Sequence, residues 1–355
     1  MRAIAVACLL AALGPGQAAP ALAQHATPSR LAIDSVASVD STVDGNGHAV
    51  NGVIADALVS VDLGRGVEGL VRPFVQRLAN TGEWNRQIWI ADLRWEHQGP
   101  VAFRVDAGYI PSPIGLANLT LRPHLNPTIA QPASLFTAPP LLEPRGTRFN
   151  LLGAIYPLGA QVTASAVHWD VRTAIIDSSP LRSRRVFADT NPPRFVNVVV
   201  GAGITPFVGF RVGASLATGG WQRANETPTV VADRNARVVT VESELAFRHT
   251  ALAGEWTRDL IDTRFGTKDV SGWYVQGQQT LSPRWFVAGR VERMASDFTL
   301  GVERESRFTA TEQTIGLRLT SDVTLRVSHR AVERFGTSGY GHTGAVSLVW
   351  FRRWM

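Results

Sequence analysis

Residues 207–216 read Phe-Val-Gly-Phe-Arg-Val-Gly-Ala-Ser-Leu, so apolar side chains alternate with small or charged ones. Successive side chains of an extended strand point to opposite faces of a sheet, and this stretch therefore predicts a strand with one apolar and one polar face. The same period of two recurs at 101–109, 314–319 and 324–330, where charged side chains occupy the polar face. Helical spacing is nearly absent after residue 30. An all-β fold is expected.

Sixteen segments follow this pattern. They are 31–41, 49–62, 67–78, 87–98, 101–109, 147–156, 160–169, 195–204, 207–217, 237–248, 251–261, 270–281, 285–295, 311–320, 323–331 and 343–352. Seven short turns, such as 64–66 and 321–322, are interleaved with eight mostly longer connections. Short turns on one side and long loops on the other are typical of a transmembrane antiparallel β-barrel. Fourteen or eighteen strands are the alternatives, because 31–41 and 170–194 are ambiguous.

The composition agrees with strands rather than helices as the membrane-spanning elements. The chain is 45 % hydrophobic and 18 % charged with a mean hydropathy of +0.02. No stretch of about 18 uncharged apolar residues occurs, which excludes membrane-spanning helices. Thirty-two Gly and twenty Pro favour many turns. The net charge of +6 says little about partners, since all basic residues except Lys268 are Arg and such a skew can reflect codon usage.

The first 23 residues have the features of a Sec-type signal peptide. Arg2 precedes an apolar run over 3–13, and Ala21-Leu22-Ala23 forms an A-x-A cleavage site. We expect cleavage after Ala23, which leaves 24–355 as the mature barrel in the outer membrane. Cleavage removes the only cysteine, Cys8, so the mature chain has no disulfide, thiolate metal site or cysteine nucleophile.

Aromatic residues near the predicted strand ends suit the two lipid interfaces. They are Tyr109, Tyr156, Trp169, Phe207, Trp273, Trp285 and Trp350. The chain ends at Phe351-Arg-Arg-Trp354-Met355, directly after an alternating segment. Bacterial outer-membrane barrels resemble this, because they close on a final strand whose last residue is usually aromatic. Here Trp354 is penultimate.

These features together resemble the sixteen-stranded porins of Gram-negative outer membranes. Two stretches, 314–328 and 107–115, are similar to segments of the phosphate-selective type, which carries anions past arginines and a cluster of lysines. The present chain has a single lysine. The resemblance implies a water-filled channel for passive diffusion of small hydrophilic or anionic solutes. It also implies outer-membrane lipid and the barrel-insertion machinery as partners, and a homotrimer.

The connection 110–146 is the candidate constriction loop, because the third external loop of porins folds into the barrel. It is the longest connection and holds eight of the twenty prolines. Proline stiffens the chain, which suits a segment packed against a barrel wall. Its ionisable candidates are Arg122, His124, Glu143 and Arg145, which predict a mildly basic and apolar constriction. The alternative is an external lid packed on its own leucines.

Charged residues of the strands are expected to face the interior. An arginine at the middle of the lipid face costs about 2–4 kcal/mol, whereas one that lines water costs little. The pore-lining candidates are Arg72, Arg94, Arg104, Asp106, Arg148, Arg211, Arg290, Arg318 and Arg326. They can form a cross-strand lattice of salt bridges or select solutes. Arg104, Arg148 and Arg211 are the strongest candidates for selection.

Enzymatic, cofactor and nucleic-acid signals are weak. The eight histidines show no metal-ligand spacing, and no nucleophile elbow, phosphate loop or dinucleotide fingerprint occurs. His168-Trp-Asp170 is the best enzyme candidate, but a non-enzymatic protein without cofactors is favoured. We therefore expect a porin with a modest anion preference. The alternatives are a non-conducting barrel with a structural or adhesive role and a soluble periplasmic β-protein that binds a ligand.

Overall fold

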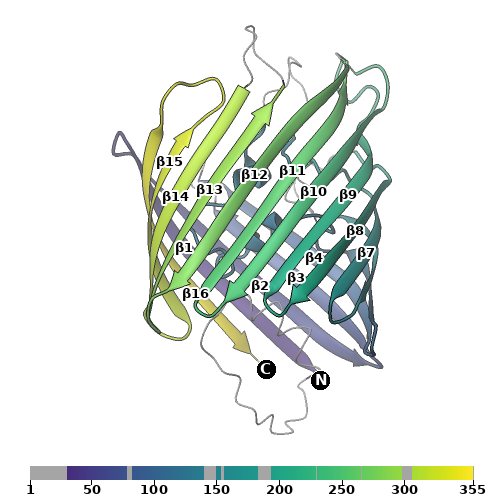
Figure 1. The fold of residues 1–355 in the computed structure, drawn as a ribbon, viewed down its shortest axis with the longest axis horizontal. Coiled ribbons are helices and arrows are strands. Elements are labelled where there is room, and N and C mark those ends of the chain that lie inside the picture. The colour runs from purple at the N-terminus through teal and green to yellow at the C-terminus, as the bar shows by residue number, and fades with distance from the viewer. Residues whose placement is uncertain are drawn as a thin grey trace.

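The structure is a computed structural model that describes residues 30–77, 82–139, 149–152, 156–182, 193–228, 230–264, 266–297 and 306–354. Sixteen antiparallel strands form one closed barrel, in which each strand pairs with its neighbours in the sequence (Figure 1). β1 pairs with β16 and closes the sheet, from Ile33 opposite Trp354 to Asp44 opposite Thr343. The predicted fold class and strand number are confirmed.

The strands vary in length from 8 to 16 residues. They are β1 (Leu31–Asp44), β2 (Ala49–Gly64), β3 (Val67–Arg77), β4 (Trp84–His97), β5 (Ala102–Tyr109), β6 (Leu158–Ser165), β7 (Trp169–Ile176), β8 (Asn197–Phe207), β9 (Phe210–Gln222), β10 (Arg234–Phe247), β11 (Thr250–Thr263), β12 (Gly266–Thr280), β13 (Trp285–Ser296), β14 (Ser306–Arg318), β15 (Val323–Glu333) and β16 (Gly341–Trp354).

Two predicted boundaries around the third long connection are wrong, and the two errors cancel in the strand count. The segment 147–156 is not a strand where it is described, since 149–152 and Tyr156 have no strand assignment and are almost all buried. In contrast, β7 lies in a region predicted mainly as loop. The third long connection therefore runs over 110–157 rather than 110–146. Apolar residues buried inside a barrel and apolar residues on a lipid-facing strand produce similar sequence patterns.

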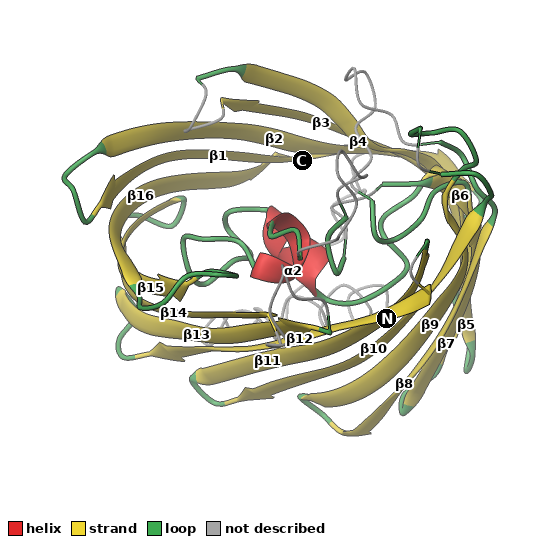
Figure 2. Cartoon of the chain, turned by 90° about the horizontal axis from the view of Figure 1, so that it is seen from above, coloured by secondary structure: helices red, strands yellow, loops and turns green. Residues whose placement is uncertain are grey.

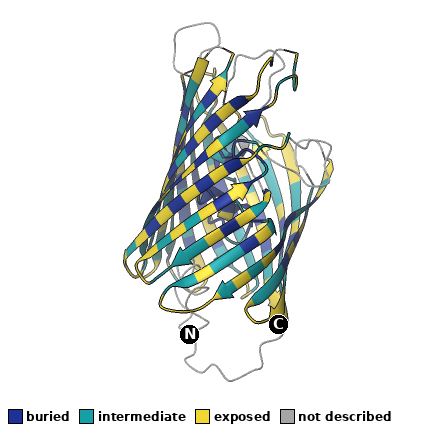
Figure 3. Ribbon diagram, turned by 90° about the vertical axis from the view of Figure 1, so that its right-hand side faces the viewer, coloured by how far each residue is buried: buried dark blue, intermediate teal, exposed yellow. Residues whose placement is uncertain are grey.

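Side chains alternate between the two faces of the wall as the sequence predicts. Exposed and buried positions succeed one another along the strands, as Figure 3 shows. In β5, Phe103 and Ala107 are exposed on the outer face while Asp106 is buried on the inner face. In β9, Ala214 and Leu216 are exposed between inward small residues. The wall thus has an apolar exterior, as required in lipid. Its interior holds the charged side chains together with a buried apolar cluster of strand residues such as Ile176, Val199 and Phe308.

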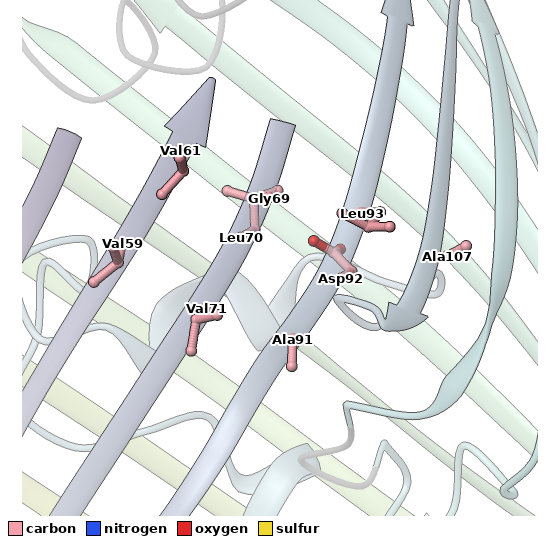
Figure 4. A pocket seen from close by; sticks show the side chains of 9 residues that line it. All are labelled: Val59, Val61, Gly69, Leu70, Val71, Ala91, Asp92, Leu93 and Ala107. Carbon is pink, nitrogen blue, oxygen red and sulfur yellow. The ribbon is translucent and has the colours of Figure 1, made fainter. Parts of the chain in front are cut away.

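The outer wall carries a shallow apolar depression over β2 to β5 (Figure 4). Its outward residues are Val59, Val61, Gly69, Val71, Ala91, Leu93 and Ala107. Gly69, Ala91 and Ala107 have small side chains or none, which lowers the surface between the larger valines and leucine. Leu70 and Asp92 alternate with these residues and are buried on the other face.

Two short helical segments interrupt the third long connection, η1 (Ala117–Leu121) and α2 (Ala133–Phe136). Seen along the barrel in Figure 2, they lie in its middle, surrounded by the strands. Among the described residues, no helix is both long and apolar enough to cross a membrane.

The face assignment in β5 predicts that Val105→Arg impairs assembly more than Arg104→Ala. Val105 shares the outer face with Phe103 and Ala107, so an arginine there costs about 2–4 kcal/mol in lipid. Removal of Arg104 leaves Asp106 paired with Arg94. The measurement is the fraction of protein that shows the heat-dependent gel mobility shift of a folded barrel. Equal tolerance of both changes would show that the two faces are assigned wrongly.

Candidate functional site

Two carboxylates of the barrel wall bind backbone amides of the third long connection. Glu255 of β11 accepts hydrogen bonds from the N–H groups of Leu116 and Ala117, the latter at 3.1 Å. Glu312 of β14 accepts from the N–H groups of residues 129 and 130 at 2.9 and 3.1 Å. Both carboxylates are almost completely buried. Backbone amides that would lack a partner inside the barrel are thereby satisfied.

A third carboxylate and two arginines continue this attachment. Glu292 of β13 accepts a hydrogen bond from the N–H of Ala133 at 2.6 Å. Arg290 donates to the Thr128 hydroxyl and the Ala130 carbonyl, each at 2.8 Å. Arg326 of β15 donates to three carbonyl oxygens within 123–128 at 2.7 to 3.1 Å. The described part of the loop, 110–139, is therefore held inside the barrel.

The opposite wall contacts the loop through one buried acid. Asp56 of β2 accepts hydrogen bonds from Arg72 of β3 at 2.5 to 3.0 Å. Arg122 of the loop lies 3.5 Å from the same carboxylate and donates to the Asp34 carbonyl at 3.1 Å. Arg72 also donates to the Tyr156 hydroxyl at 2.8 Å. A loop residue and a wall residue thus share one counter-ion.

Aromatic rings pack around this ion cluster. Phe74 stacks on Trp89 at 3.8 Å, and Trp89 stacks on Tyr156 at 5.0 Å. The guanidinium of Arg72 lies 4.6 Å from the centre of the Trp89 ring. Tyr156, predicted at a lipid interface, is instead buried inside the barrel. The prediction failed because a ring at the end of an apolar run looks the same in both places.

His124 is part of this wall contact and carries no charge. Its ring stacks on Phe351 of β16, with centres 4.2 Å apart and planes within 6°. Burial, reinforced by Arg122 and then Arg72, lowers the pKa of His124 to about 2. Burial also lowers the pKa of Arg122, although Asp56 acts in the opposite direction. Of these two loop residues, only Arg122 contributes a charge, and it faces a carboxylate.

A second charge network covers the wall from β4 to β10. Arg94 lies 2.7 Å and Arg104 3.0 Å from the carboxylate of Asp106. Arg211 of β9 is held between Asp170 of β7 at 3.0 Å and Glu242 of β10 at 2.8 Å. Arg104 and Asp106 lie on the same strand, whereas the other pairs join neighbouring or next-nearest strands and so tie the wall together.

Glycine makes room for one of these long-range pairs. Gly203 of β8 lies between the strands that carry Arg211 and Asp170. A Cβ atom at this position would come within 2.6 Å of both charged side chains. Arg172 of β7 crosses the same strand to reach Glu242 at 3.2 Å and the Ser215 hydroxyl at 2.6 Å.

The remaining residues predicted for the pore and the constriction have three different placements. Arg318 lies at the turn end of β14, where it donates to the Pro283 carbonyl and lies 5.4 Å over the Phe286 ring. Arg148, Glu143 and Arg145 lie outside the described residues. Arg290 and Arg326 contact the loop, as described above.

Two buried acids that contact the loop, Asp56 and Glu312, were not among the site residues predicted from the sequence. The period of two nevertheless places each of them on the inner face of its strand. Their partners could not be read from the sequence, because Glu312 contacts a loop 182 and 183 residues away along the chain. Arg172 was not predicted, and Asp170 was considered only in the enzyme candidate, because the segment from residue 170 onward, most of β7, was predicted as loop.

Within the described residues, the segment 110–139 makes hydrogen bonds to only part of the barrel wall. Among the described residues, no hydrogen bond joins 110–139 to a strand from β6 to β10, whereas β1, β11 and β13 to β15 all bond it. The inward charges of β7, β9 and β10 pair with one another instead. At the loop end of this side, Phe149 and Leu151 of the same connection pack in one buried cluster with Val199 and Trp221. At the turn end, the side chains of Asp170, Arg172 and Arg211 remain partly exposed. The charged turn-end part of this side is therefore the candidate passage.

No family model matches the chain, and no curated protein matches it. Solved structures do match. OmpT of Vibrio cholerae in its trimer form has a TM-score of 0.60 at 10 % identity, over 91 % of this chain and 99 % of that one. The chain has the porin fold. An anion-selective porin from Comamonas acidovorans gives a TM-score of 0.58 at 11 % identity, over 91 % and 98 % of the two chains.

Another porin-fold match is OmpF of Salmonella typhi in a complex with daunomycin. It has a TM-score of 0.58 at 10 % identity, over 91 % of this chain and 97 % of that one. At such identities the similarity extends to the fold alone. A homotrimer of this chain stays a prediction.

The attachment of the loop predicts that Glu312→Ala destabilises the porin fold strongly. The change leaves two loop amides and Arg290 without their carboxylate, and loss of one partner from a buried ion pair costs about 3–5 kcal/mol. The measurement is the free energy of unfolding in denaturant, with Glu333→Ala as control. Glu333 makes no ion pair with any residue in the described ranges, so its loss is expected within about 0.5 kcal/mol. Equal effects of both changes would contradict the attachment.

The low pKa of His124 predicts an acid-sensitive contribution to stability. An unfolded histidine has a pKa of about 6.5, so below that pH the unfolded chain binds a proton that the folded chain does not. Folded-state stability therefore falls as the pH drops below about 6.5, by about 1 kcal/mol per pH unit from this group. His124→Phe retains the ring on Phe351 and should reduce that slope, whereas exposed His249→Phe should not. The measurement is the unfolding free energy between pH 7 and pH 5.

Proposed function

We propose that this chain forms a passive, water-filled channel for small hydrophilic solutes in the outer membrane. The observation that carries the proposal is the loop 110–139, which β1, β11 and β13 to β15 hold inside the barrel while the paired charges at the turn end of β7 and β9 remain partly exposed. The loop narrows the interior, and these charged side chains mark the remaining passage. The apolar outer face supports placement in a lipid bilayer.

Export by the N-terminal segment is part of the proposal. Residues 1–23, with cleavage after Ala23, lie outside the described residues. The sequence features of a signal peptide support export, and the strand at Gly341–Trp354 supports recognition by the barrel-insertion machinery.

We further propose that the protein is not an enzyme. In the best enzyme candidate, His168 lies 3.1 Å from the Thr205 carbonyl, and Asp170 is paired with Arg211. The acid is therefore engaged by a cation rather than by the histidine, and no hydroxyl nucleophile is bonded to the ring in the described structure. A general base needs its proton donor within hydrogen-bond reach.

The proposed passage is weakly selective, because its charges nearly cancel. The inner face of β4 to β10 carries five arginines and six carboxylates. They are Arg94, Arg104, Arg172, Arg211 and Arg234 together with Asp92, Glu96, Asp106, Asp170, Glu242 and Glu244. The Arg104 side chain is 39 % exposed, whereas those of Arg94, Arg172 and Arg211 are 18–21 % exposed and Arg234 is buried. Arg104 is therefore the residue best placed to attract anions, and it carries the modest anion preference that the sequence predicts.

Planar bilayer recordings test the channel and its selectivity. Stepwise conductance is expected, and silence across many insertions would favour a structural or adhesive barrel instead. Under a salt gradient, Arg104→Ala should shift the reversal potential toward cation preference, because it removes a partly exposed positive charge from the inner face of the wall. Arg258→Ala removes the same charge from the outer face, where Arg258 is paired with Asp269, and should leave the reversal potential unchanged. An unchanged potential in Arg104→Ala would exclude this residue as the selectivity determinant.

A further inference from the structure

Three polar side chains meet on the outer face of the barrel. Gln313 of β14, His329 of β15 and His342 of β16 are all exposed. Gln313 lies opposite His329, and Ala331 lies opposite His342, so the two histidines are diagonal neighbours on one face. Polar groups on this face are costly in hydrocarbon, and His342 is the second residue of β16 at the loop end. The cluster therefore lies at the rim, where water and lipid headgroups are available.

The spacing of the ring nitrogens matches that of two ligands on one metal ion. His329 Nε2 lies 3.2 Å from His342 Nδ1, and the ring centres are 5.3 Å apart with planes within 19°. Histidine nitrogens bind Zn²⁺ at about 2.0–2.1 Å, so two of them in a tetrahedral arrangement are about 3.3 Å apart. The two nitrogens have the separation that chelation requires, which is also that of the hydrogen bond they share, so a bound metal ion would replace the proton between them.

The third side chain, Gln313, determines which ring nitrogen of His329 is available to a metal ion. His329 Nδ1 lies 3.2 Å from the Oε1 atom of Gln313. An amide oxygen can only accept a hydrogen bond, so Nδ1 carries the proton and Nε2 keeps its lone pair. Histidines that bind metal commonly donate their other ring N–H to an oxygen in this manner. Gln313 therefore acts as a positioning residue.

The space in front of His329 is open. Gly344 of β16 is the residue opposite His329, and no atom lies within 4 Å of the place that a Cβ atom at Gly344 would occupy. A metal ion with additional oxygen ligands from water or headgroups has room there. The described residues contain no group of three or more His, Cys, Asp or Glu side chains that could hold a metal ion.

We propose that His329 and His342 form a two-histidine site for a borderline divalent transition-metal ion such as Zn²⁺ at the outer rim of the barrel. Imidazole suits Zn²⁺ and its neighbours, whereas Mg²⁺ prefers oxygen ligands. The site is independent of the proposed channel, since it lies on the opposite face of the wall.

The test uses untagged, folded protein in detergent, titrated with ZnCl₂ in a calorimeter, with MgCl₂ as comparison. One Zn²⁺ per chain should bind, and Zn²⁺ at saturation should raise the thermal unfolding midpoint by about 3 °C. His329→Ala and His342→Ala should each weaken binding at least tenfold. His249→Ala, which removes another exposed histidine, should bind as the unmodified protein does. Absence of Zn²⁺ binding, or equal binding by all three variants, would overturn the proposal.

The positioning role of Gln313 has a separate readout. Gln313→Leu should weaken Zn²⁺ binding severalfold, and Gln313→Glu should restore it, because a carboxylate accepts the same proton from His329. All variants are first checked for the heat-dependent gel shift of a folded barrel. Unchanged affinity in Gln313→Leu, or loss that Gln313→Glu does not restore, would exclude this role.

Discussion

Pairing of β1 with β16 is the constraint on which the rest of this structure depends. An unsatisfied backbone N–H or C=O group in hydrocarbon costs several kcal/mol, so a sheet that spans a membrane cannot have a free edge. The pairing from Ile33–Trp354 to Asp44–Thr343 removes the last two edges. Once the sheet is closed, each strand has one face toward lipid and one toward an enclosed interior. That division requires the alternation of side chains and directs the charges inward.

The enclosed interior in turn determines what the charges do. On one side, Glu255, Glu292 and Glu312 bind backbone amides of the loop, while Arg290 and Arg326 bind its hydroxyl and carbonyl groups. On the other side, the arginines and acids of β7 to β10 pair with each other across the wall. Buried charges are tolerated only when they are paired or hydrogen-bonded. The same residue types therefore attach a loop at one wall and line a candidate passage at the other.

The facing of side chains was predictable because a period of two is a local property, whereas the strand number was correct because the errors at 147–156 and at β7 cancelled. The alternation in 207–216 needs no knowledge of neighbouring strands, and the structure places Ala214 and Leu216 outward as expected. The strand prediction from alternating side chains was wrong at 147–156 and at β7. In the first case the loop residues Leu151 and Leu152 are buried inside the barrel and mimic a strand. In the second, alternation of Asp170 and Arg172 with apolar residues was present but was attributed to a loop.

The sequence by itself determined that the chain folds as an antiparallel barrel of about sixteen strands and, in the strands that it predicted, which side chains face inward, because lipid penalises charge locally at each position. Only the tertiary structure decided which of the inward groups meet. Asp56 pairs with both Arg72 and Arg122, and Glu312 binds a loop far away in the sequence, through contacts that depend on register and on the path of the loop. The same holds for His329 and His342, which share a face because β15 and β16 pair in one register. A shift of one residue would move a strand's side chains to the opposite face.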